Sequence, residues 1–329
     1  MAFFDVSPRE LEQAVGRALN LWPIGHEAVA DLLNISENRT YLVRVNGVPS
    51  YVLRLYRPGY QTQASINGEL AWCDALIRDG VVLAPTALEG VDGQKVQTIE
   101  LGDPPRAVHM ALFTYAPGDH PRADEDLETY FESLGRIAAK LHEHALIWAP
   151  IEEPQRRHWD LSALLGKDAI WGDWRDAPNM TPDMAKSLES AEIVLRERLA
   201  RYGTEAERYG LIHADMRLAN LLVDGTTLHL IDFDDCGYGW LMYDFAAAIS
   251  FMEDDPNVPA LRTSWLKGYR ELRCLPTDDE AEIDTFVLLR RMALLAWVGS
   301  HPHASEAAEL APGFAQGTAR LARAFLNAN

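Results

Sequence analysis

The sequence predicts an α+β protein with two lobes, in which an antiparallel sheet with one long helix precedes a mostly helical region. Three observations support this fold class. Strand-like runs at 41–45 and 51–56 flank Asn46-Gly47, a strong hairpin signal. Residues 63–79 place apolar side chains on one face of a helix. Beyond Pro117-Gly118, the apolar spacing becomes mostly helical.

The remaining elements follow from caps and periodicity. Ser7-Pro8-Arg9-Glu10 is a capping box with proline at the first helical position, so a helix is expected to about Asn20. Apolar spacing predicts further strands at about 94–100, 106–114, 211–213, 221–223 and 228–232, and helices near 127–141, 181–201, 258–273, 279–299 and 305–327. We expect two lobes, an N-terminal one at 1–115 and a C-terminal one at 116–329.

Composition narrows the class of protein. The chain has 329 residues, 48% of them hydrophobic, and a formal net charge of −19, which argues against a nucleic-acid partner. Its three cysteines share no short spacing, which excludes a disulfide framework or a cysteine-based zinc site. We see no signal-peptide pattern and no apolar run long enough for a membrane span. We therefore expect a cytoplasmic protein without a membrane partner; the oligomeric state stays open.

The residues that carry chemistry are concentrated between 211 and 245. This run contains the motif His213-x-Asp215-x4-Asn220, then a hairpin through Asp224-Gly225, then Ile231-Asp232-Phe233. Asp215 follows a strand, where its carboxylate can face a substrate hydroxyl. The hairpin brings Asp232 back toward Asn220, and Mg²⁺ prefers such oxygen ligands. Phosphoryl transfer needs a carboxylate for the hydroxyl proton and Mg²⁺ against the phosphates, so the run predicts that chemistry.

This run resembles the catalytic segment of the aminoglycoside phosphotransferase and choline kinase family, which also includes type II homoserine kinases and a bacterial stress-response Ser/Thr kinase. The resemblance implies a protein-kinase-like two-lobed fold with ATP and Mg²⁺ as cofactors. It implies that Asp215 is the catalytic base and that Asn220 and Asp232 bind the metal. His213 would hold the loop, and Asp244 would bond the catalytic loop or cap a helix.

The same resemblance makes residues 1–115 the expected nucleotide-binding lobe and residues 116–329 the expected catalytic and substrate-binding lobe. Ser36 and Asn38 fall where the family has its nucleotide-covering loop. Met110, Phe113 and Tyr115 fall in the hinge segment, whose backbone would pair with adenine.

Two features depart from protein kinases. Arg54 stands where kinases have a phosphate-binding lysine, and its expected partner is Glu69; arginine keeps the charge and can pair bidentately. Ala214 replaces the arginine of the kinase loop, and only eleven residues separate Asp232 from Asp244. An activation loop of the usual length does not fit there, which favours a constitutively assembled site.

The sequence therefore predicts transfer of the γ-phosphoryl group of ATP to a hydroxyl of a small molecule. Acidic and aromatic side chains near the motif favour an amine-bearing acceptor such as an aminoglycoside, an amino alcohol or a homoserine-like compound. The candidate acceptor wall consists of Asp234, Asp235, Trp240 and Tyr243. Two alternatives stay open: a Ser/Thr protein kinase of the stress-response type, which the run 51–58 resembles, and a catalytically weak pseudokinase-type ATP-binding module, for which Arg54 is the support.

Overall fold

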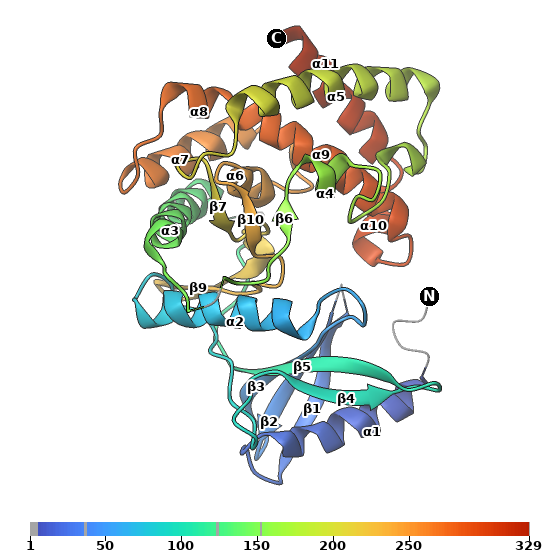
Figure 1. The fold of residues 1–329 in the computed structure, drawn as a ribbon, viewed down its shortest axis with the longest axis vertical. Helices are drawn as coiled ribbons and strands as arrows, with labels where there is room; N and C mark the ends of the chain where they lie inside the picture. Colours follow the sequence, from blue (N-terminus) through green and yellow to red (C-terminus); the bar gives the residue numbers. More distant parts are fainter. Residues whose placement is uncertain (1–5, 36–37, 123–124, 152, 329) are drawn as a thin grey trace. The chain divides into compact units, whose positions relative to one another are not determined.

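The computed structural model describes residues 6–35, 38–122, 125–151 and 153–328 (Figure 1). Its chain divides into two compact units, each built from three segments. The first unit takes Met1–Asp119, Pro150–Arg156 and Leu222–Asp234, and the second takes His120–Ala149, Arg157–Leu221 and Asp235–Asn329. The expected division of roles at residue 115 stays a prediction.

The first unit contains a five-stranded antiparallel sheet in the order β1-β2-β3-β5-β4. Asn46 and Gly47 both have positive φ, 52° and 79°, as a two-residue turn of this hairpin requires. The predicted hairpin is therefore confirmed. The strands are β1 (Ala28–Ile35), β2 (Arg39–Val45), β3 (Val48–Leu55), β4 (Gln97–Leu101) and β5 (Arg106–Thr114).

Each face of this sheet is covered by a helix, as Figure 1 shows for α1 (Pro8–Ala18) and α2 (Gln63–Arg78). Successive residues of a strand point to opposite faces, so neighbours on β5 enter different cores. Met110 packs in the cluster that contains Leu11 and Val15 of α1. Ala111 packs in the cluster that contains Ile66 and Leu70 of α2. The sheet is thereby fixed from both sides.

A short hairpin, β8 (Leu221–Asp224) and β9 (Thr227–Leu230), completes the first unit. Leu230 N–H donates to the carbonyl of Leu83 at 2.9 Å, and the backbones of Asp119 and Val223 exchange bonds at 3.1 and 2.8 Å. The strand predicted to reach residue 232 ends at Leu230. Asp232 instead has a φ of 63°, a left-handed conformation that breaks the strand.

The second unit is mostly helical, as predicted. Its helices are α3 (Leu127–Ile147), α4 (Leu161–Leu165), α5 (Pro182–Tyr202), α6 (Tyr243–Ala248), α7 (Val258–Arg270), α8 (Thr277–Ala281), α9 (Ile283–Ser300), α10 (Ser305–Leu310) and α11 (Phe314–Ala328). The predictions of single helices at 279–299 and 305–327 were wrong, because each range holds two helices. Pro312 and Gly313 separate α10 from α11, since proline lacks the amide hydrogen that a continuous helix needs.

A three-stranded sheet, in the order β6-β10-β7, was only partly predicted. Its strands are β6 (His158–Trp159), β10 (Gly237–Trp240) and β7 (Tyr209–Ile212). No strand was predicted for β10, because two of its four residues are glycine, which is depleted in strands. A Cβ on Gly237 would lie 2.5 Å from the carbonyl oxygen of Arg157, so close strand packing requires glycine there.

Helices α3 and α7 cross at two glycines, and each glycine lies against the backbone of the other helix. A Cβ on Gly135 would lie 1.9 Å from the carbonyl oxygen of Trp265, and a Cβ on Gly268 would lie 1.9 Å from that of Glu132. Both distances are far below van der Waals contact. The two helices therefore approach as closely as they do only because neither glycine has a side chain.

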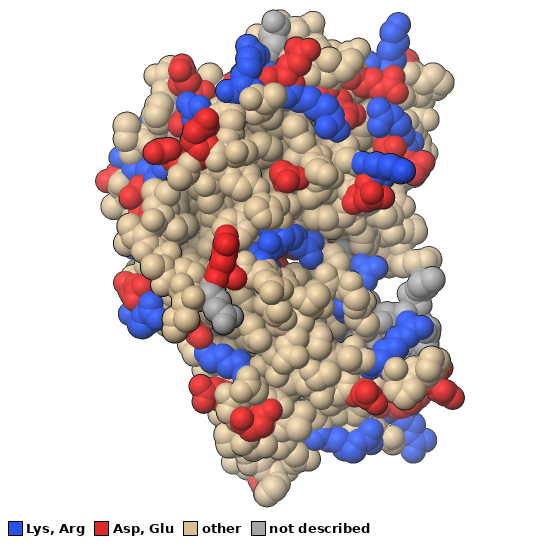
Figure 2. Space-filling view, in the orientation of Figure 1, with Lys and Arg blue, Asp and Glu red and all other residues tan. Residues whose placement is uncertain are grey.

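The surface is charged, and no helix among the described residues is long and apolar enough for a bilayer span. Figure 2 shows acidic and basic side chains intermixed on the visible face. The chain keeps its net charge of −19, but many of its acidic side chains lie beside basic partners. Pairs of this kind include Arg136 with Glu271 and Lys267 with Glu132, both at 2.6 Å.

Replacing glycine by alanine usually stabilises a helix, but at the crossing of α3 and α7 we expect the opposite. Gly135→Ala should lower the free energy of unfolding by about 3 kcal/mol, because the methyl group would overlap the Trp265 carbonyl. Urea denaturation followed by circular dichroism measures this. The matched control is Gly16→Ala in α1, which meets no atom within 4 Å and should stabilise by about 0.5 kcal/mol. Equal effects of the two substitutions would contradict the close crossing.

Candidate functional site

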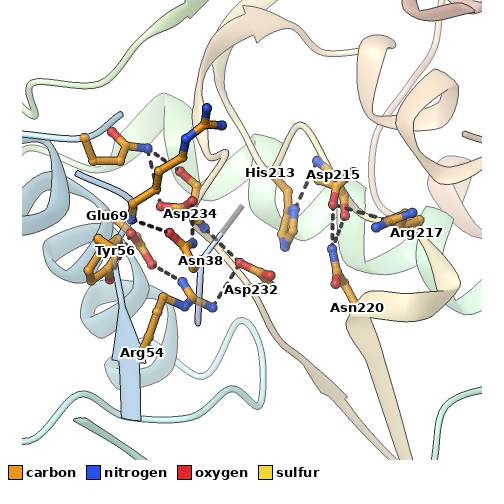
Figure 3. A network of polar contacts seen from close by, with 12 residues as sticks. Asn38, Arg54, Tyr56, Glu69, His213, Asp215, Arg217, Asn220, Asp232 and Asp234 are labelled. Carbon is orange, nitrogen blue, oxygen red and sulfur yellow. Dashed lines mark hydrogen bonds and ion pairs between the residues drawn. The ribbon is translucent and has the colours of Figure 1, made fainter. Parts of the chain in front are cut away.

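In the first unit, the predicted pair of Arg54 and Glu69 forms. Figure 3 shows the Arg54 guanidinium, from β3, between two carboxylates. Its Nη1 lies 3.1 Å from Glu69 Oε1 on α2, and its Nη2 lies 2.9 Å from Asp232 Oδ1. Arg54 therefore ties a strand, a helix and the turn after β9 together, with one planar donor group serving both acids.

Burial dominates the electrostatics of this pair. The Glu69 side chain is almost fully buried, and loss of hydration raises its pKa to about 8, although the charge of Arg54 opposes that shift. Burial disfavours the charge of Arg54, while Asp232, Tyr56 and Glu69 favour it, and the net effect is a raised pKa. Arg54 thus stays a cation. Tyr56 Oη donates a further bond to Glu69 Oε2 at 3.4 Å.

Asp234 is a buried acceptor in the first unit. Its carboxylate accepts bonds from Asn38 Nδ2 at 2.9 Å and from Gln61 Nε2 at 3.3 Å. Its backbone carbonyl accepts from Gln61 and from Arg156. Asn38 Oδ1 in turn accepts the backbone N–H of Arg57 at 3.1 Å. The role of Asp234 in an acceptor wall stays a prediction; its observed contacts fix Asn38 beside the turn of residues 232–234. Ser36 lies outside the described residues.

The predicted hinge residues lie on β5 and just after it. The Met110 side chain is fully buried in the core against α1, so only its backbone is available to a ligand. The Phe113 ring centre lies 5.3 Å from the Arg54 guanidinium carbon, within cation–π distance. Tyr115 is exposed. The adenine contact of this segment stays a prediction.

In the second unit, a buried carboxylate holds the loop that follows β7. Asp244 Oδ2 accepts the backbone N–H of His213 at 3.2 Å, and Oδ1 accepts that of Ala214 at 2.7 Å. Ala214 has a φ of 64°, a conformation that non-glycine residues rarely adopt without support. Asp244 therefore bonds the loop, which was one of its two predicted roles. His213 Nδ1 then accepts the backbone N–H of Asp215 at 3.3 Å.

Sequence analysis missed His142, which contacts Asp244 from α3. His142 Nε2 lies 3.0 Å from Asp244 Oδ2, and Nδ1 lies 2.9 Å from Tyr269 Oη. A carboxylate oxygen accepts, so His142 Nε2 carries the hydrogen of its bond to Asp244. All three side chains are fully buried. A histidine at a helical core position gives no sequence signal of such a partner.

Asp215 itself is held from two sides within the second unit. Asn220 Nδ2 donates to Asp215 Oδ2 at 2.8 Å, and Arg217 Nε lies 3.4 Å from the same oxygen, as Figure 3 shows. Arg290 Nη2, from α9, donates to Oδ1 at 2.9 Å. The carboxylate is 17% exposed, so it keeps access to solvent while its direction is set. Sequence analysis also missed Arg290, which lies 75 residues away.

Two side-chain oxygens, one of Asn220 and one of Asp232, are of the kind that binds a hard cation. Asn220 Nδ2 donates to both the backbone carbonyl and the carboxylate of Asp215, and no described residue donates to Asn220 Oδ1. Within the described chain, no residue bonds Asp232 Oδ2 either. Mg²⁺ is commonly held by one or two protein oxygens together with phosphate and water. Among the described residues, no three His, Cys, Asp or Glu side chains lie close enough together to hold a metal ion by themselves.

The other predicted wall residues lie in the second unit. Trp240 is buried, its Nε1 donates to the Gly203 carbonyl at 2.8 Å, and its ring packs against Tyr209 and Phe286, so these contacts account for its burial. Tyr243 is fully buried, and its hydroxyl accepts from Arg290 at 3.4 Å. Asp235 is half-buried, and its carbonyl accepts Trp159 Nε1 at 2.7 Å. A role in acceptor binding stays a prediction for all three.

Comparison with known proteins gives a consistent result. A family model described as the phosphotransferase enzyme family matches residues 32–286. The solved structure of a microcompartment-associated aminopropanol kinase is 41% identical, with a TM-score of 0.89, over 96% of this chain and 98% of that chain. The fold class predicted from the sequence and the predicted family resemblance are both confirmed.

Two further similarities involve amicoumacin kinases. The enzyme of Bacillus subtilis is 24% identical over 294 residues, which cover 86% of this chain and 83% of that protein. A solved amicoumacin kinase, hAmiN, in complex with AMP-PNP, Ca²⁺ and Ami, is 20% identical with a TM-score of 0.76, over 94% of this chain and 93% of that chain. At this identity the solved structure supports the shared fold.

The contacts of Asp244 predict a large effect of its loss. Asp244→Ala should lower the free energy of unfolding by about 3 kcal/mol, because it leaves buried N–H groups without an acceptor. Asp244→Asn retains one acceptor oxygen and should cost less. Urea denaturation measures both. The matched control is Asp284→Ala, which removes an exposed carboxylate that pairs with Arg262. It should lower the free energy of unfolding by less than about 0.5 kcal/mol. Similar losses for Asp244→Ala and Asp284→Ala would refute the supporting role of Asp244.

Proposed function

The chain belongs to the phosphotransferase enzyme family, and we propose that it transfers the γ-phosphoryl group of ATP to the hydroxyl group of a small amino alcohol. The observation that carries this proposal is the likeness to an aminopropanol kinase, at 41% identity over nearly the whole length of both chains. The loop of Asp215 and the Arg54 cluster supply the polar groups that this reaction needs.

Asp215 is the proposed base. Its carboxylate accepts the proton of the acceptor hydroxyl as the oxygen bonds to the γ-phosphorus, while the bond from phosphorus to the leaving oxygen of ADP breaks. A base must point at the hydroxyl when the bond forms. The bonds from Asn220 and Arg290 to the two carboxylate oxygens give Asp215 a fixed direction before any acceptor arrives.

Arg54 is the proposed phosphate contact in place of lysine. Each of its Nη atoms carries two hydrogens, and the contacts with Glu69 and Asp232 use one on each. The remaining hydrogens can therefore bond phosphate oxygens without loss of the pair with Glu69. Because Glu69 holds one edge of the guanidinium, the group presents its charge from a fixed place on β3.

Asn220 and Asp232 are the proposed ligands of Mg²⁺, through the Oδ1 and Oδ2 atoms that no described residue bonds. The bound cation supplies neutralisation of charge on the β- and γ-phosphates. The chain contributes the orientation of both ligands. Asn220 is oriented by its two bonds to Asp215, and Asp232 by the contact of its Oδ1 with Arg54.

Asp235 is the proposed partner of the acceptor amine. It is half-buried in the second unit and close enough to Tyr243 and Arg290 to act on the pKa of both. A protonated amine brings its own positive charge, which a partly desolvated carboxylate binds more strongly than a neutral hydroxyl group. This arrangement favours an amino alcohol over a plain alcohol, and the net charge of −19 favours its approach.

An acceptor panel tests the proposed reaction. With ATP and Mg²⁺, aminopropanol should promote ADP release with a kcat/KM roughly 10²-fold above that of propanediol, which lacks the amine. Asp215→Asn should lower kcat by roughly 10²-fold or more without weakening ATP binding. ADP release is followed by a coupled assay, and ATP binding by calorimetry. Turnover of generic protein substrates, with none of any amino alcohol in the panel, would contradict the proposal and favour a protein kinase.

A metal titration tests the role of Asp232. Asp232→Ala should weaken binding of ATP in the presence of Mg²⁺ by at least roughly tenfold, because it removes a carboxylate from the cation. Calorimetric titrations of ATP at several Mg²⁺ concentrations measure this. The matched control is Asp224→Ala, an exposed acid on the same hairpin, which should bind as the parent does. Unchanged Mg²⁺ dependence in Asp232→Ala would remove Asp232 from the metal site.

A further inference from the structure

Arg290 lies behind the proposed base in the second unit. We propose that Arg290 is a positioning residue that fixes the Asp215 carboxylate through Oδ1, so that Oδ2, which accepts Asn220 Nδ2, keeps its second lone pair for the acceptor hydroxyl. This inference rests on the proposed function, because it assigns a helper to the base of that reaction. Its evidence is the pattern of contacts around one buried guanidinium.

Three polar contacts hold the Arg290 guanidinium. Nη2 donates to Asp215 Oδ1 at 2.9 Å, Nε donates to Ser250 Oγ at 3.0 Å, and Nη1 lies 3.4 Å from Tyr243 Oη. Each nitrogen thus has its own partner, which leaves the planar group little freedom to rotate. A carboxylate bonded to so constrained a donor takes its orientation from that donor.

Burial makes this contact costly to break. The Arg290 side chain is 3% exposed, and its guanidinium carbon lies 5.3 Å from the ring centre of Trp171 and 5.7 Å from that of Tyr243. Among the described residues, Asp215 is the acid that pairs with it. A buried cation is stable only with a paired anion, so the aromatic surroundings keep Arg290 and Asp215 together.

Arg217, the second cation beside Asp215, is more exposed than Arg290 and lies farther from the carboxylate. Arg217 is 27% exposed, its Nε lies 3.4 Å from Asp215 Oδ2, and its Nη1 lies 3.2 Å from Glu306 Oε1. Among the described residues, Arg217 Nε has no hydrogen-bond acceptor, so its contact with Oδ2 is electrostatic and does not set the direction of the carboxylate. An arriving acceptor hydroxyl can therefore bond Oδ2 beside Asn220, while Arg290 keeps its bond to Oδ1.

The next residue of α9 shows that this pairing is specific. Arg291 is also buried, but its guanidinium bonds Glu253 and Thr318 and not Asp215. Two successive arginines on one helix thus each have their own acid. Arg290 therefore pairs with Asp215 because its place on α9 directs its side chain to the loop after β7.

Loss of Arg290 should reduce the rate of transfer and not the affinity for nucleotide. Without the bond to Oδ1, the carboxylate can rotate away from the acceptor oxygen, and a misdirected base lowers kcat by roughly 10²-fold. Arg290→Lys keeps the charge but cannot serve three partners, so its loss of kcat should be smaller than that of Arg290→Gln. The affinity for ATP should stay within about twofold of the parent, because Arg290 acts on the base alone.

A double-mutant cycle tests this role. Arg290→Gln is made in the parent and in Asp215→Asn, and kcat for phosphorylation of aminopropanol is measured in all four proteins in the steady state at saturating substrate. If Arg290 acts through Asp215, the substitution should lower kcat roughly 10²-fold in the parent and by less than about threefold in Asp215→Asn. Equal factors in both backgrounds would overturn the inference.

A second variant controls for damage to the fold. Ser250→Ala removes the partner of Arg290 Nε without touching Asp215. It should lower kcat modestly in the parent and not at all in the Arg290→Gln background. If Arg290→Gln does not fold, the same cycle is run with Arg290→Lys and Ser250→Ala. If Asp215→Asn retains the parent kcat, the assignment of Asp215 as the base is wrong. If Asp215→Asn loses activity and Arg290→Gln lowers kcat by the same factor in both backgrounds, only the positioning role of Arg290 is wrong.

Discussion

The buried carboxylate of Asp244 is the constraint on which the second unit's site depends. It accepts two successive backbone N–H groups of the loop after β7 and a histidine from α3. These bonds stabilise the left-handed conformation of Ala214, which turns the chain so that Asp215 follows at the surface. Because Asp244 is fully buried, its polar atoms depend on these donors, and the loop cannot move without exposing or unpairing the carboxylate.

Both units use the same arrangement for a functional carboxylate. Asp232 follows a short strand and is held by Arg54, which is fixed on β3 by Glu69. Asp215 follows a short strand and is held by Arg290, which is fixed on α9 by Ser250. In each case the acid lies on a turn and the cation on a regular element. The rigid scaffold thus sets the direction of groups that the loops alone would leave free.

The sequence was informative where chemistry depends on local spacing. The motif of Asp215 and Asn220, the hairpin before Asp232 and the Arg54–Glu69 pair all follow from short-range pattern and family resemblance. It was uninformative where partners meet only in the folded chain. His142 and Arg290 lie 102 and 75 residues from the acids that they contact, on helices whose apolar pattern predicts only core packing. The glycines of β10 concealed a strand for a similar reason, since their close packing is a tertiary property.

The glycine crossing of α3 and α7 also limits how the second unit can move. A slide of one helical turn would bring Phe131 or Ala139, which carry side chains, to the place of Gly135 beneath the Trp265 carbonyl. The same holds in reverse for Gly268. The two helices are therefore locked in register and behave as one mechanical body. Since α3 also carries His142, this body anchors the Asp244 network.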